Sequence, residues 1–345
     1  MITTLDDNTR DMDPKFSVLQ KALDVYSYVG LWITLSASVI LFNKYILTVY
    51  KFPFPVALTM IHMAFCSVLA FIIVRLLQWV PSSNMSRQTY LKRIVPVAGL
   101  FALSLWTSNT AYVYLSVAFI QMLKALMPVT VYTVGCAVGT ESYSHARFAN
   151  MLVVTLGVAI SSYGELNFHF FGFCVQLVAI LAETCRIILV QIILGKANLK
   201  LNSMTTLYYV SPACLVFLLI PFAFLELPEI AYRVELTHTT RHSTVIMFAN
   251  AACAFALNAA VYLLIGKTSA LTMNIAGVAK DFFLILFSSF IFDAPISSLQ
   301  IVGFFIAVSG VFYYNYSKYE EAVNLADKAN ATSNDTSRNL AKERA

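Results

Sequence analysis

The chain has 345 residues, of which 59% are hydrophobic and only 12% are charged. An ordinary soluble domain carries about 25% charged residues, so this composition excludes a typical soluble enzyme. The net charge of +5 is small, and no basic run is interleaved with aromatic residues, which argues against a nucleic-acid partner. The apolar residues instead cluster in blocks of about 20, the length that crosses a lipid bilayer as a helix.

Ten such blocks, separated by short polar joints, predict an all-α membrane protein with ten transmembrane helices. Polar tails at residues 1–20 and 318–345 are expected to be flexible, and the second tail could extend the last helix. The predicted spans are residues 26–48, 55–79, 92–112, 116–138, 148–165, 170–194, 204–227, 244–265, 269–292 and 297–317.

The basic residues of the joints predict the orientation of the chain in the membrane. Cytosolic joints are enriched in Lys and Arg, and a cytosolic N-terminus gives eight such residues inside against three outside. Both termini are therefore expected in the cytosol. The inside set is Arg75, Arg87, Lys92, Arg93, Arg147, Lys196, Lys200 and Lys267, and the outside set is Lys51, Arg233 and Arg241.

The first residues of the chain argue against import into plastids or mitochondria. Asp6, Asp7, Asp11 and Asp13 lie in this segment, whereas transit peptides are poor in acidic residues. The C-terminal Lys342-Glu343-Arg344-Ala345 has no dilysine pattern. We expect a Golgi membrane, with the endoplasmic reticulum or another organelle left open.

Weak similarities between the two halves of the chain suggest a repeat. Asn109 in the third span is echoed by Asn258 in the eighth, and Gly157-Val158 by Gly310-Val311. Five spans in each half would make the second half enter from the opposite side, as in the 5+5 inverted repeats of secondary transporters. The predicted units are a first repeat at 21–165 and a second at 166–317; chance similarity between apolar helices is the alternative.

Lys124 and Lys280 are the sequence features that suggest a function. They lie near the middle of the fourth and ninth spans, where a charge costs about 2.5–3.5 kcal/mol or more and normally faces a cavity or partner. A two-fold axis between repeats would bring these two cations to one cavity, where a phosphate or diphosphate would separate them. Pro128 is expected to weaken the helix at Lys124 and free its carbonyl, and Gly277 permits a close approach of backbone near Lys280.

The remaining charges within the spans allow two interpretations each. Asp281 is expected to meet a neighbouring helix rather than Lys280, since adjacent helical residues point about 100° apart. Glu183 and Arg186 have the spacing of a salt bridge on one helix face, but Arg186 is equally a candidate anion contact. Lys44 lies near a helix end, from which it could extend to the interface.

The sequence predicts no enzyme. It contains no nucleophile–base set, phosphate-binding loop or paired carboxylates, and its cysteines show no CxxC spacing, so we expect neither a metal nor another cofactor. His62, in the second span, is interpreted as a hydrogen-bonded packing histidine rather than a proton carrier.

Four segments give a resemblance to a known family. The chain resembles the nucleotide-sugar and triose-phosphate translocators of the drug/metabolite transporter superfamily, from about Tyr26 to Tyr316. Within that family it is similar to the Lys-Asp subgroup labelled probable sugar phosphate/phosphate translocators, some plant members of which carry UDP-arabinofuranose into the Golgi. The segments are NKYIL (43–47), LTMIHM (58–63), SLWTSNTAYVYLSVAFIQMLKALMPV (104–129) and GKTSALTMNIAGVAKD (266–281).

The resemblance implies ten helices, an inverted repeat and strict exchange, with phosphate held at the positions of Lys124 and Lys280. Plastid members follow the second lysine with arginine, whereas Asp281 stands here, and the GALNK-type motif of GDP-mannose carriers is missing. We therefore expect a UDP-sugar exchanged for a nucleoside monophosphate. The alternatives are a sugar phosphate or phosphoenolpyruvate exchanged for phosphate, and a membrane scaffold or receptor without transport activity.

Further substrate contacts are expected from polar residues that flank the predicted cavity. These candidates are Asn109, Asn258, Tyr112, Tyr262, Arg186 and Lys44, with Asp281 and Glu183 as gating or pairing residues. The oligomeric state is left open, a homodimer included.

Overall fold

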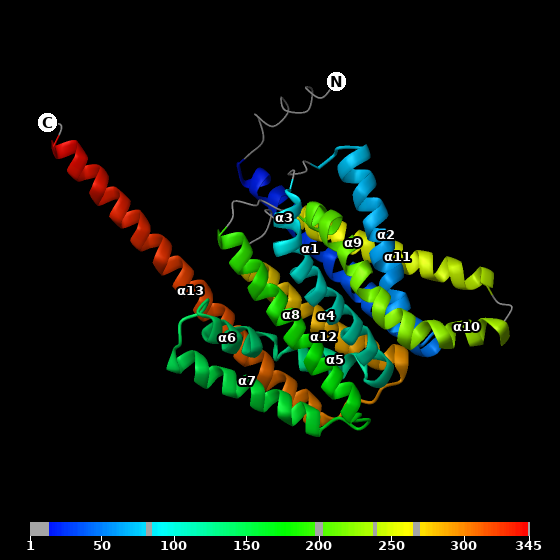
Figure 1. The fold of residues 1–345 in the computed structure, drawn as a ribbon. Helices are drawn as coiled ribbons and strands as arrows, with labels where there is room; N and C mark the ends of the chain where they lie inside the picture. The colour runs from blue at the N-terminus through cyan, green and yellow to red at the C-terminus, as the bar shows by residue number, and fades with distance from the viewer. Residues whose placement is uncertain (1–13, 81–84, 197–202, 237–239, 265–269, 344–345) are drawn as a thin grey trace. The chain divides into compact units, whose positions relative to one another are not determined.

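The computed structural model describes residues 14–80, 85–196, 203–236, 240–264 and 270–343 (Figure 1). All regular structure within these ranges is helical. Nine of the helical segments in this part of the chain are long and apolar enough to cross a membrane. The prediction of an all-α membrane protein is therefore confirmed.

The nine segments coincide with nine of the ten predicted spans, and their ends differ by only a few residues. They are Tyr26–Val49, Pro55–Leu76, Arg87–Tyr114, Val117–Val138, His145–Tyr163, Phe170–Ile192, Met204–Tyr232, Thr244–Val261 and Ser298–Glu321. The remaining predicted span, 269–292, is occupied by the helix α12 (Ala270–Phe292), whose first side chains lie outside the described residues. The last helix, α13 (Ser298–Glu343), continues for 46 residues through the predicted C-terminal tail.

The chain forms two compact units, each assembled from both halves of the sequence. Unit 1 consists of Met1–Val113 and Ile193–Ser269, and unit 2 of Tyr114–Ile192 and Ala270–Ala345. The second and seventh spans, the fourth and ninth, and the fifth and tenth each pack together within one unit. This pairing is what a two-fold relation between 21–165 and 166–317 would give, although the inverted repeat itself stays a prediction.

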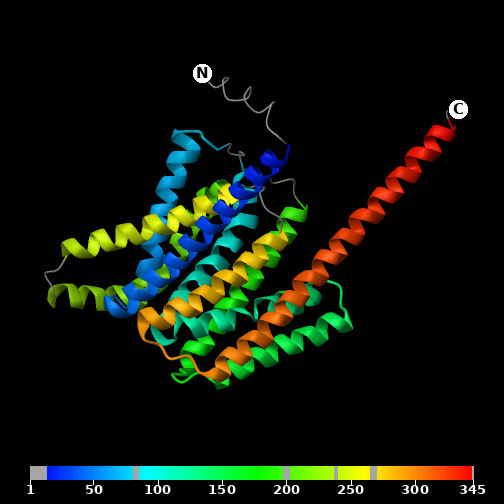
Figure 2. The same ribbon diagram turned by 180° about the vertical axis from the view of Figure 1, so that it is seen from behind.

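Unit 1 is organised around the packing of α2 against α9 and of α1 against α11, which Figure 2 shows from behind. Short π-helical turns, labelled η, follow several of its helices. Its helices are α1 (Pro14–Lys44), α2 (Pro55–Phe71), α3 (Arg87–Thr89), α4 (Val95–Tyr114), α9 (Ser203–Pro221), α10 (Leu227–Leu236) and α11 (Thr240–Leu264). The turns are η1 (Tyr45–Val49), η2 (Ile72–Leu76), η3 (Tyr90–Ile94) and η4 (Phe222–Glu226).

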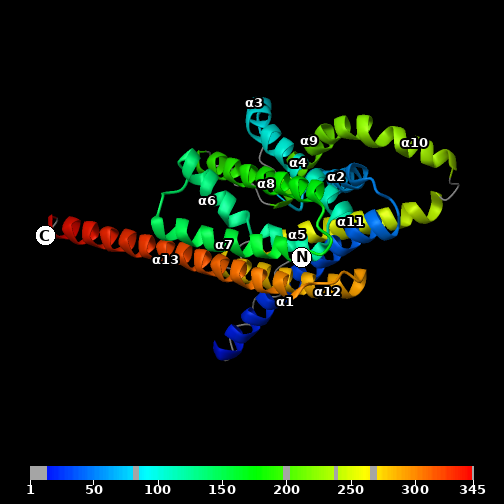
Figure 3. The same cartoon turned by 90° about the horizontal axis from the view of Figure 1, so that it is seen from below.

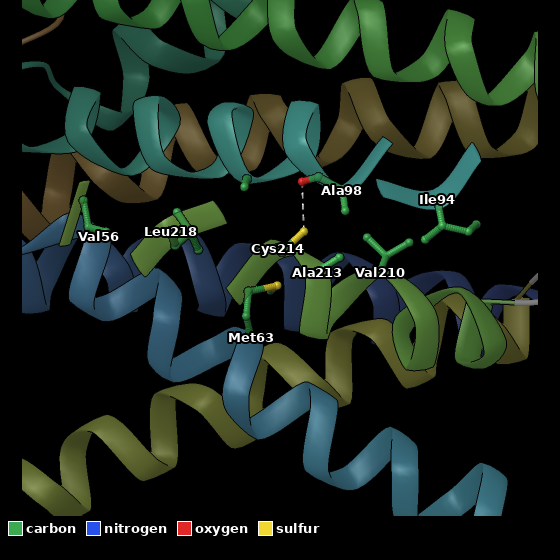
Figure 4. Packing of buried hydrophobic residues seen from close by; sticks show 9 residues of the cluster. Val56, Met63, Ile94, Ala98, Val210, Ala213, Cys214 and Leu218 are labelled. Carbon is green, nitrogen blue, oxygen red and sulfur yellow. Dashed lines mark hydrogen bonds between the residues drawn. The ribbon is translucent and has the colours of Figure 1, made fainter. Parts of the chain in front are cut away.

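A core of small and branched side chains joins α2, α4 and α9 (Figure 4). Cys214 of α9 is fully buried there and donates its Sγ–H to the Ala98 carbonyl at 3.2 Å. Cys214 is therefore a buried free thiol. At the entrance of α2, Pro55 occupies the first turn, and the Glu226 carboxylate accepts hydrogen bonds from Val56 N–H at 2.8 Å and Ala57 N–H at 2.7 Å. An acidic group is favourable at a helix N-terminus because the first N–H groups lack partners within the helix.

Unit 2 contains the helices around the predicted lysine site. In Figure 3, α13 runs alongside α7. Glycines allow this close approach: a Cβ added at Gly157 would lie 2.5 Å from the Ala307 nitrogen, and one at Gly303 would lie 2.5 Å from the Gly157 oxygen. The helices of unit 2 are α5 (Val117–Lys124), α6 (Met127–Val138), α7 (His145–Tyr163), α8 (Phe170–Lys196), α12 and α13.

Large apolar side chains are exposed along the outer faces of these helices. Phe224 and Phe290, for example, are 78% and 81% exposed. A water-soluble protein rarely exposes so much contiguous apolar surface, whereas hydrocarbon chains solvate it well.

Candidate functional site

The fourth predicted span is interrupted at Lys124. Helix α5 ends at Lys124 and α6 begins at Met127, and the N–H groups of Ala125 and Leu126 donate to carbonyls only three residues back, at 3.1 and 3.0 Å. Pro128 has no N–H to offer the Lys124 carbonyl four residues earlier, which is the physical reason for the break. The interruption predicted from Pro128 is confirmed, and broken helices of this kind form substrate sites in transporters.

A cavity of about 230 Å³ lies beside this break, within unit 2. Its polar wall residues come from α5, α12 and α13, and its apolar ones mostly from α6 and α13. Gly277 borders it at a position where an added Cβ would meet no atom within 4 Å, so this glycine faces open space. The cavity is lined by Gln121, Lys124, Ala125, Met127, Pro128, Gly277, Val278, Asp281, Phe304, Val308, Val311 and Asn315.

Lys280 forms an ion pair with its neighbour, with 3.1 Å between its Nζ and Asp281 Oδ1. The expectation that Asp281 would meet another helix rather than Lys280 is therefore wrong. Adjacent side chains on a helix do leave the backbone in different directions, but the flexible four-carbon stem of lysine is long enough to bend back to the neighbouring carboxylate. Among the described lining residues, Asp281 is present and Lys280 is not. Where the sequence predicts two cations, the cavity wall therefore has one cation, Lys124, and the Asp281 carboxylate that is paired with Lys280.

Glu183 and Arg186 form a salt bridge on α8, as their spacing allows. The Arg186 guanidinium donates from Nε at 2.8 Å and from Nη2 at 2.5 Å to the two carboxylate oxygens of Glu183. This bidentate contact, with both side chains about one-quarter exposed, favours the pairing role of Arg186 over the anion-binding role.

The other candidate contacts belong to unit 1, where Lys44 and Asn258 donate hydrogen bonds to main-chain carbonyls. Lys44, the last residue of α1, donates from Nζ to the Tyr112 carbonyl at 2.7 Å. This carbonyl is near the C-terminal end of α4, where the helix dipole favours a cation. Asn258 donates to the Ala254 carbonyl of its own helix at 2.9 Å. The side chain of Tyr262 lies outside the described residues.

Asn109 belongs to a chain of buried hydrogen bonds that crosses four helices. Asn250 Nδ2 donates to Asn43 Oδ1 at 3.0 Å, Asn43 Nδ2 to Asn109 Oδ1 at 3.2 Å, and Asn109 Nδ2 to Thr59 Oγ1 at 2.9 Å. His62 Nε2 contacts the Asn250 Oδ1 atom at the start of this chain. Because that oxygen only accepts, the histidine nitrogen must carry a hydrogen. His62 is thus buried and hydrogen-bonded, which supports its interpretation as a packing histidine, and Asn109 has structural partners on two sides.

A larger hollow of about 440 Å³ lies in unit 1, where spans two, three and seven have their neighbouring ends. Arg87 is the one cation among the described residues that line it, and tyrosines form much of its wall. The cavity beside Lys124 matches a doubly charged phosphate better, because it lies at a helix break, where transporters form substrate sites. The hollow is lined by Ser67, Phe71, Met85, Arg87, Tyr90, Tyr208, Tyr209 and Pro212.

Sequence reasoning missed Gln121 and Asn315 in the cavity of unit 2 because it searched the spans for charges. Gln121 stands three residues before Lys124, a spacing that puts both on one helix face. That spacing is the signal that would have identified it.

Comparison with known proteins gives a consistent result. The model of the Triose-phosphate Transporter family matches residues 23–315. Two probable sugar phosphate/phosphate translocators of Arabidopsis thaliana are 49% and 50% identical to the chain, each over 88% of this chain and 86% of the relative. A UDP-uronic acid transporter of the same plant is 29% identical over 88% of this chain and 98% of its own length. A solved crystal structure shares the fold with a TM-score of 0.50 and 11% identity, covering 84% of this chain and 94% of that chain.

Proposed function

This chain belongs to the Triose-phosphate Transporter family, and on that premise we propose that it is an antiporter for a phosphate-bearing sugar. The cargo that we propose first is a nucleotide sugar, specifically a UDP-sugar, which enters the Golgi lumen in exchange for a nucleoside monophosphate. Lys124 and Lys280 bind the phosphate groups, and access alternates between the two sides of the membrane.

The pairing of Lys280 with Asp281 is the observation that carries this proposal. The carboxylate cancels one of the two lysine charges, and Lys124 has no ion pair within the described part of the chain. A phosphate monoester concentrates a charge near −2 on one group at neutral pH. The diphosphate of a nucleotide sugar divides its charge between two groups, so it requires less positive charge at any one point.

A sugar phosphate or phosphoenolpyruvate exchanged for inorganic phosphate is the second candidate. The cavity volume of about 230 Å³ lies below the range of roughly 300–1,000 Å³ that is usual for ligand pockets, which favours a small cargo. The printed names of the two relatives near 50% identity also contain this substrate class.

The test uses the purified full chain in liposomes loaded with either UMP or inorganic phosphate. External UDP-sugars and sugar phosphates are then offered as radiolabelled substrates. We expect uptake of a UDP-sugar that requires internal UMP. Uptake that occurs only with internal phosphate would reject the nucleotide sugar and support the second candidate, and a failure of every probe would favour a scaffold or receptor.

Variants of the same protein test the residues. Lys124→Ala and Lys280→Ala are expected to abolish exchange, whereas the exposed Lys92→Ala serves as a control for loss of a lysine. Asp281→Arg restores the second positive charge and should shift the ratio of uptake toward sugar phosphates. Full exchange by Lys280→Ala would refute the assignment of that lysine.

The proposed location is the Golgi membrane, based on the acidic N-terminal segment, the missing dilysine pattern and the family resemblance. The proposed orientation has both termini in the cytosol, based on the distribution of Lys and Arg. An epitope after Ala345 should react with antibody when the plasma membrane alone is permeabilised. Detection only after the Golgi membrane is opened would reverse the orientation.

A further inference from the structure

Gln121 is a buried amide whose polar atoms have no hydrogen-bond partner among the residues that the structure describes. It is 1% exposed, and neither its Oε1 nor its Nε2 makes a hydrogen bond with the described residues. Burying such a group without hydrogen bonds costs free energy, so buried amides normally find partners. Gln121 borders the cavity of unit 2 with both polar atoms still covered, so a turn of its amide toward the cavity would let a bound molecule supply both missing bonds.

The amide stands beside the lysine that we assign to phosphate. Gln121 precedes Lys124 by three residues on α5, so the two side chains share a face and their positions differ by about 4.5 Å along the helix axis. Asp281 borders the same cavity from α12. Among the described residues, the polar wall thus presents the Lys124 cation, the amides of Gln121 and Asn315, and the Asp281 carboxylate.

We propose that Gln121 determines specificity by binding hydroxyl groups of the sugar that adjoins the phosphate at Lys124. This proposal rests on the proposed function, and it holds for a nucleotide sugar and for a sugar phosphate because each has a sugar directly next to phosphate; phosphoenolpyruvate has no sugar hydroxyl and falls outside it. A hydroxyl donates and accepts, as does the amide, and the Asp281 carboxylate accepts from a second hydroxyl. A nucleobase is separated from the phosphate by a ribose, so it does not fit this short distance as well.

Inorganic phosphate bound at Lys124 lacks the sugar whose hydroxyl groups would lie against Gln121. A site that is built to hydrogen-bond a hydroxyl rejects a ligand without one, because its own buried groups are then left unpaired. Loss of the two amide bonds should therefore weaken sugar-bearing ligands by about 10- to 100-fold and change the affinity for inorganic phosphate little.

The experiment measures the affinity of the purified full chain for four probes. The affinity is read either from how well each probe competes with uptake of a radiolabelled substrate or from how much each probe raises the melting temperature. The probes are inorganic phosphate, glucose 1-phosphate, UMP and UDP-glucose. The variant Gln121→Leu keeps the approximate volume and removes both polar atoms. Gln176→Leu is the matched control, because Gln176 of α8 is also 1% exposed with an unpaired Oε1 but does not line the cavity.

We expect Gln121→Leu to reduce the preference for sugar-bearing probes over phosphate by 10- to 100-fold, whereas Gln176→Leu keeps the wild-type preference. The melting temperature without ligand should not fall, because the variant removes an unsatisfied buried group. An unchanged preference, or an equal loss for all four probes, would overturn the role of Gln121. If Gln121→Leu does not fold, Gln121→Glu decides the question, because it keeps an acceptor and adds a negative charge. The role of Gln121 stands only if this variant weakens the sugar-bearing probes more than it weakens inorganic phosphate.

The proposed function fails in a different way from the role of Gln121. If the wild-type chain binds none of the four probes, or if Lys124→Met binds them all normally, the anion site itself is wrong. If Lys124→Met loses all four probes while Gln121→Leu resembles wild type, only the role of Gln121 is rejected.

Discussion

Substitution of Asn109 distinguishes a structural amide from a substrate contact. The Asn109 side chain accepts a hydrogen bond from Asn43 Nδ2 and donates one to Thr59 Oγ1, and all three residues are buried. In Asn109→Leu, the Asn43 donor is left without an acceptor. Thr59 loses less, because its hydroxyl still donates to the Pro55 carbonyl at 2.7 Å.

The magnitude follows from these two losses. An unsatisfied buried donor costs about 1–3 kcal/mol, and the lost bond to Thr59 about 0.5–1.5 kcal/mol. Burial of the added apolar surface offsets part of this, so we expect a net loss of about 1–4 kcal/mol. At about 2–4 °C for each kcal/mol, the apparent melting temperature should fall by about 2–16 °C.

The assay is a double-mutant cycle with Asn43→Leu, read by thermal unfolding, together with the KM for uptake. If the amides support each other, the double variant should be less destabilised than the sum of the single variants, with a coupling of about 0.5–3 kcal/mol. The KM of the folded fraction should stay near the wild-type value. Additive losses, or a raised KM at an unchanged melting temperature, would refute the structural role and favour the substrate contact.

Three further predictions concern stability. Glu226→Ala leaves the N–H groups of Val56 and Ala57 without their acceptor and should lower the free energy of unfolding by about 2–5 kcal/mol. Glu226→Gln should be about half as damaging because one acceptor oxygen remains. Equal melting temperatures for the two variants would contradict this. Gly157→Ala should cost about 1–3 kcal/mol, because its Cβ would meet backbone at 2.5 Å, whereas the control Gly30→Ala has no atom within 4 Å and should be tolerated. Burial raises the pKa of the Glu165 carboxyl above its usual 4.5, so the folded state holds this proton more tightly and stability should fall as the pH rises through the raised pKa. Glu165→Gln should flatten that pH dependence, and an unchanged slope would exclude Glu165 as its source.

The spans were predictable because a bilayer imposes a length and a composition on each helix. Blocks of about 20 apolar residues fix where helices lie, and the ends of nine agree within a few residues. The break at Lys124 was also predictable, since the missing N–H of Pro128 acts locally, whatever the surrounding fold.

Contacts between helices were not predictable in the same way. The sequence offers Asn109 as a polar residue in an apolar span, but nothing in it shows that Asn43 and Thr59 lie on either side. Gln121 was missed for a related reason, because a neutral amide costs less in a membrane than a charge and gives a weaker signal. Its importance depends on burial and on unpaired atoms, which are properties of the folded chain.

The ion pair of Lys280 with Asp281 resolves the difficulty that this lysine presents in an apolar helix. An ammonium in a span must face either a partner or a water-filled cavity at every stage, including the stage when no cargo is bound. A neighbouring carboxylate supplies that partner permanently, whereas the Lys124 ammonium borders a cavity at a helix break. A carrier must also release what it binds, and two uncompensated lysines would hold a phosphate more strongly than one. The acidic residue therefore reconciles a charge in the membrane with reversible binding, which is the requirement that exchange places on such a site.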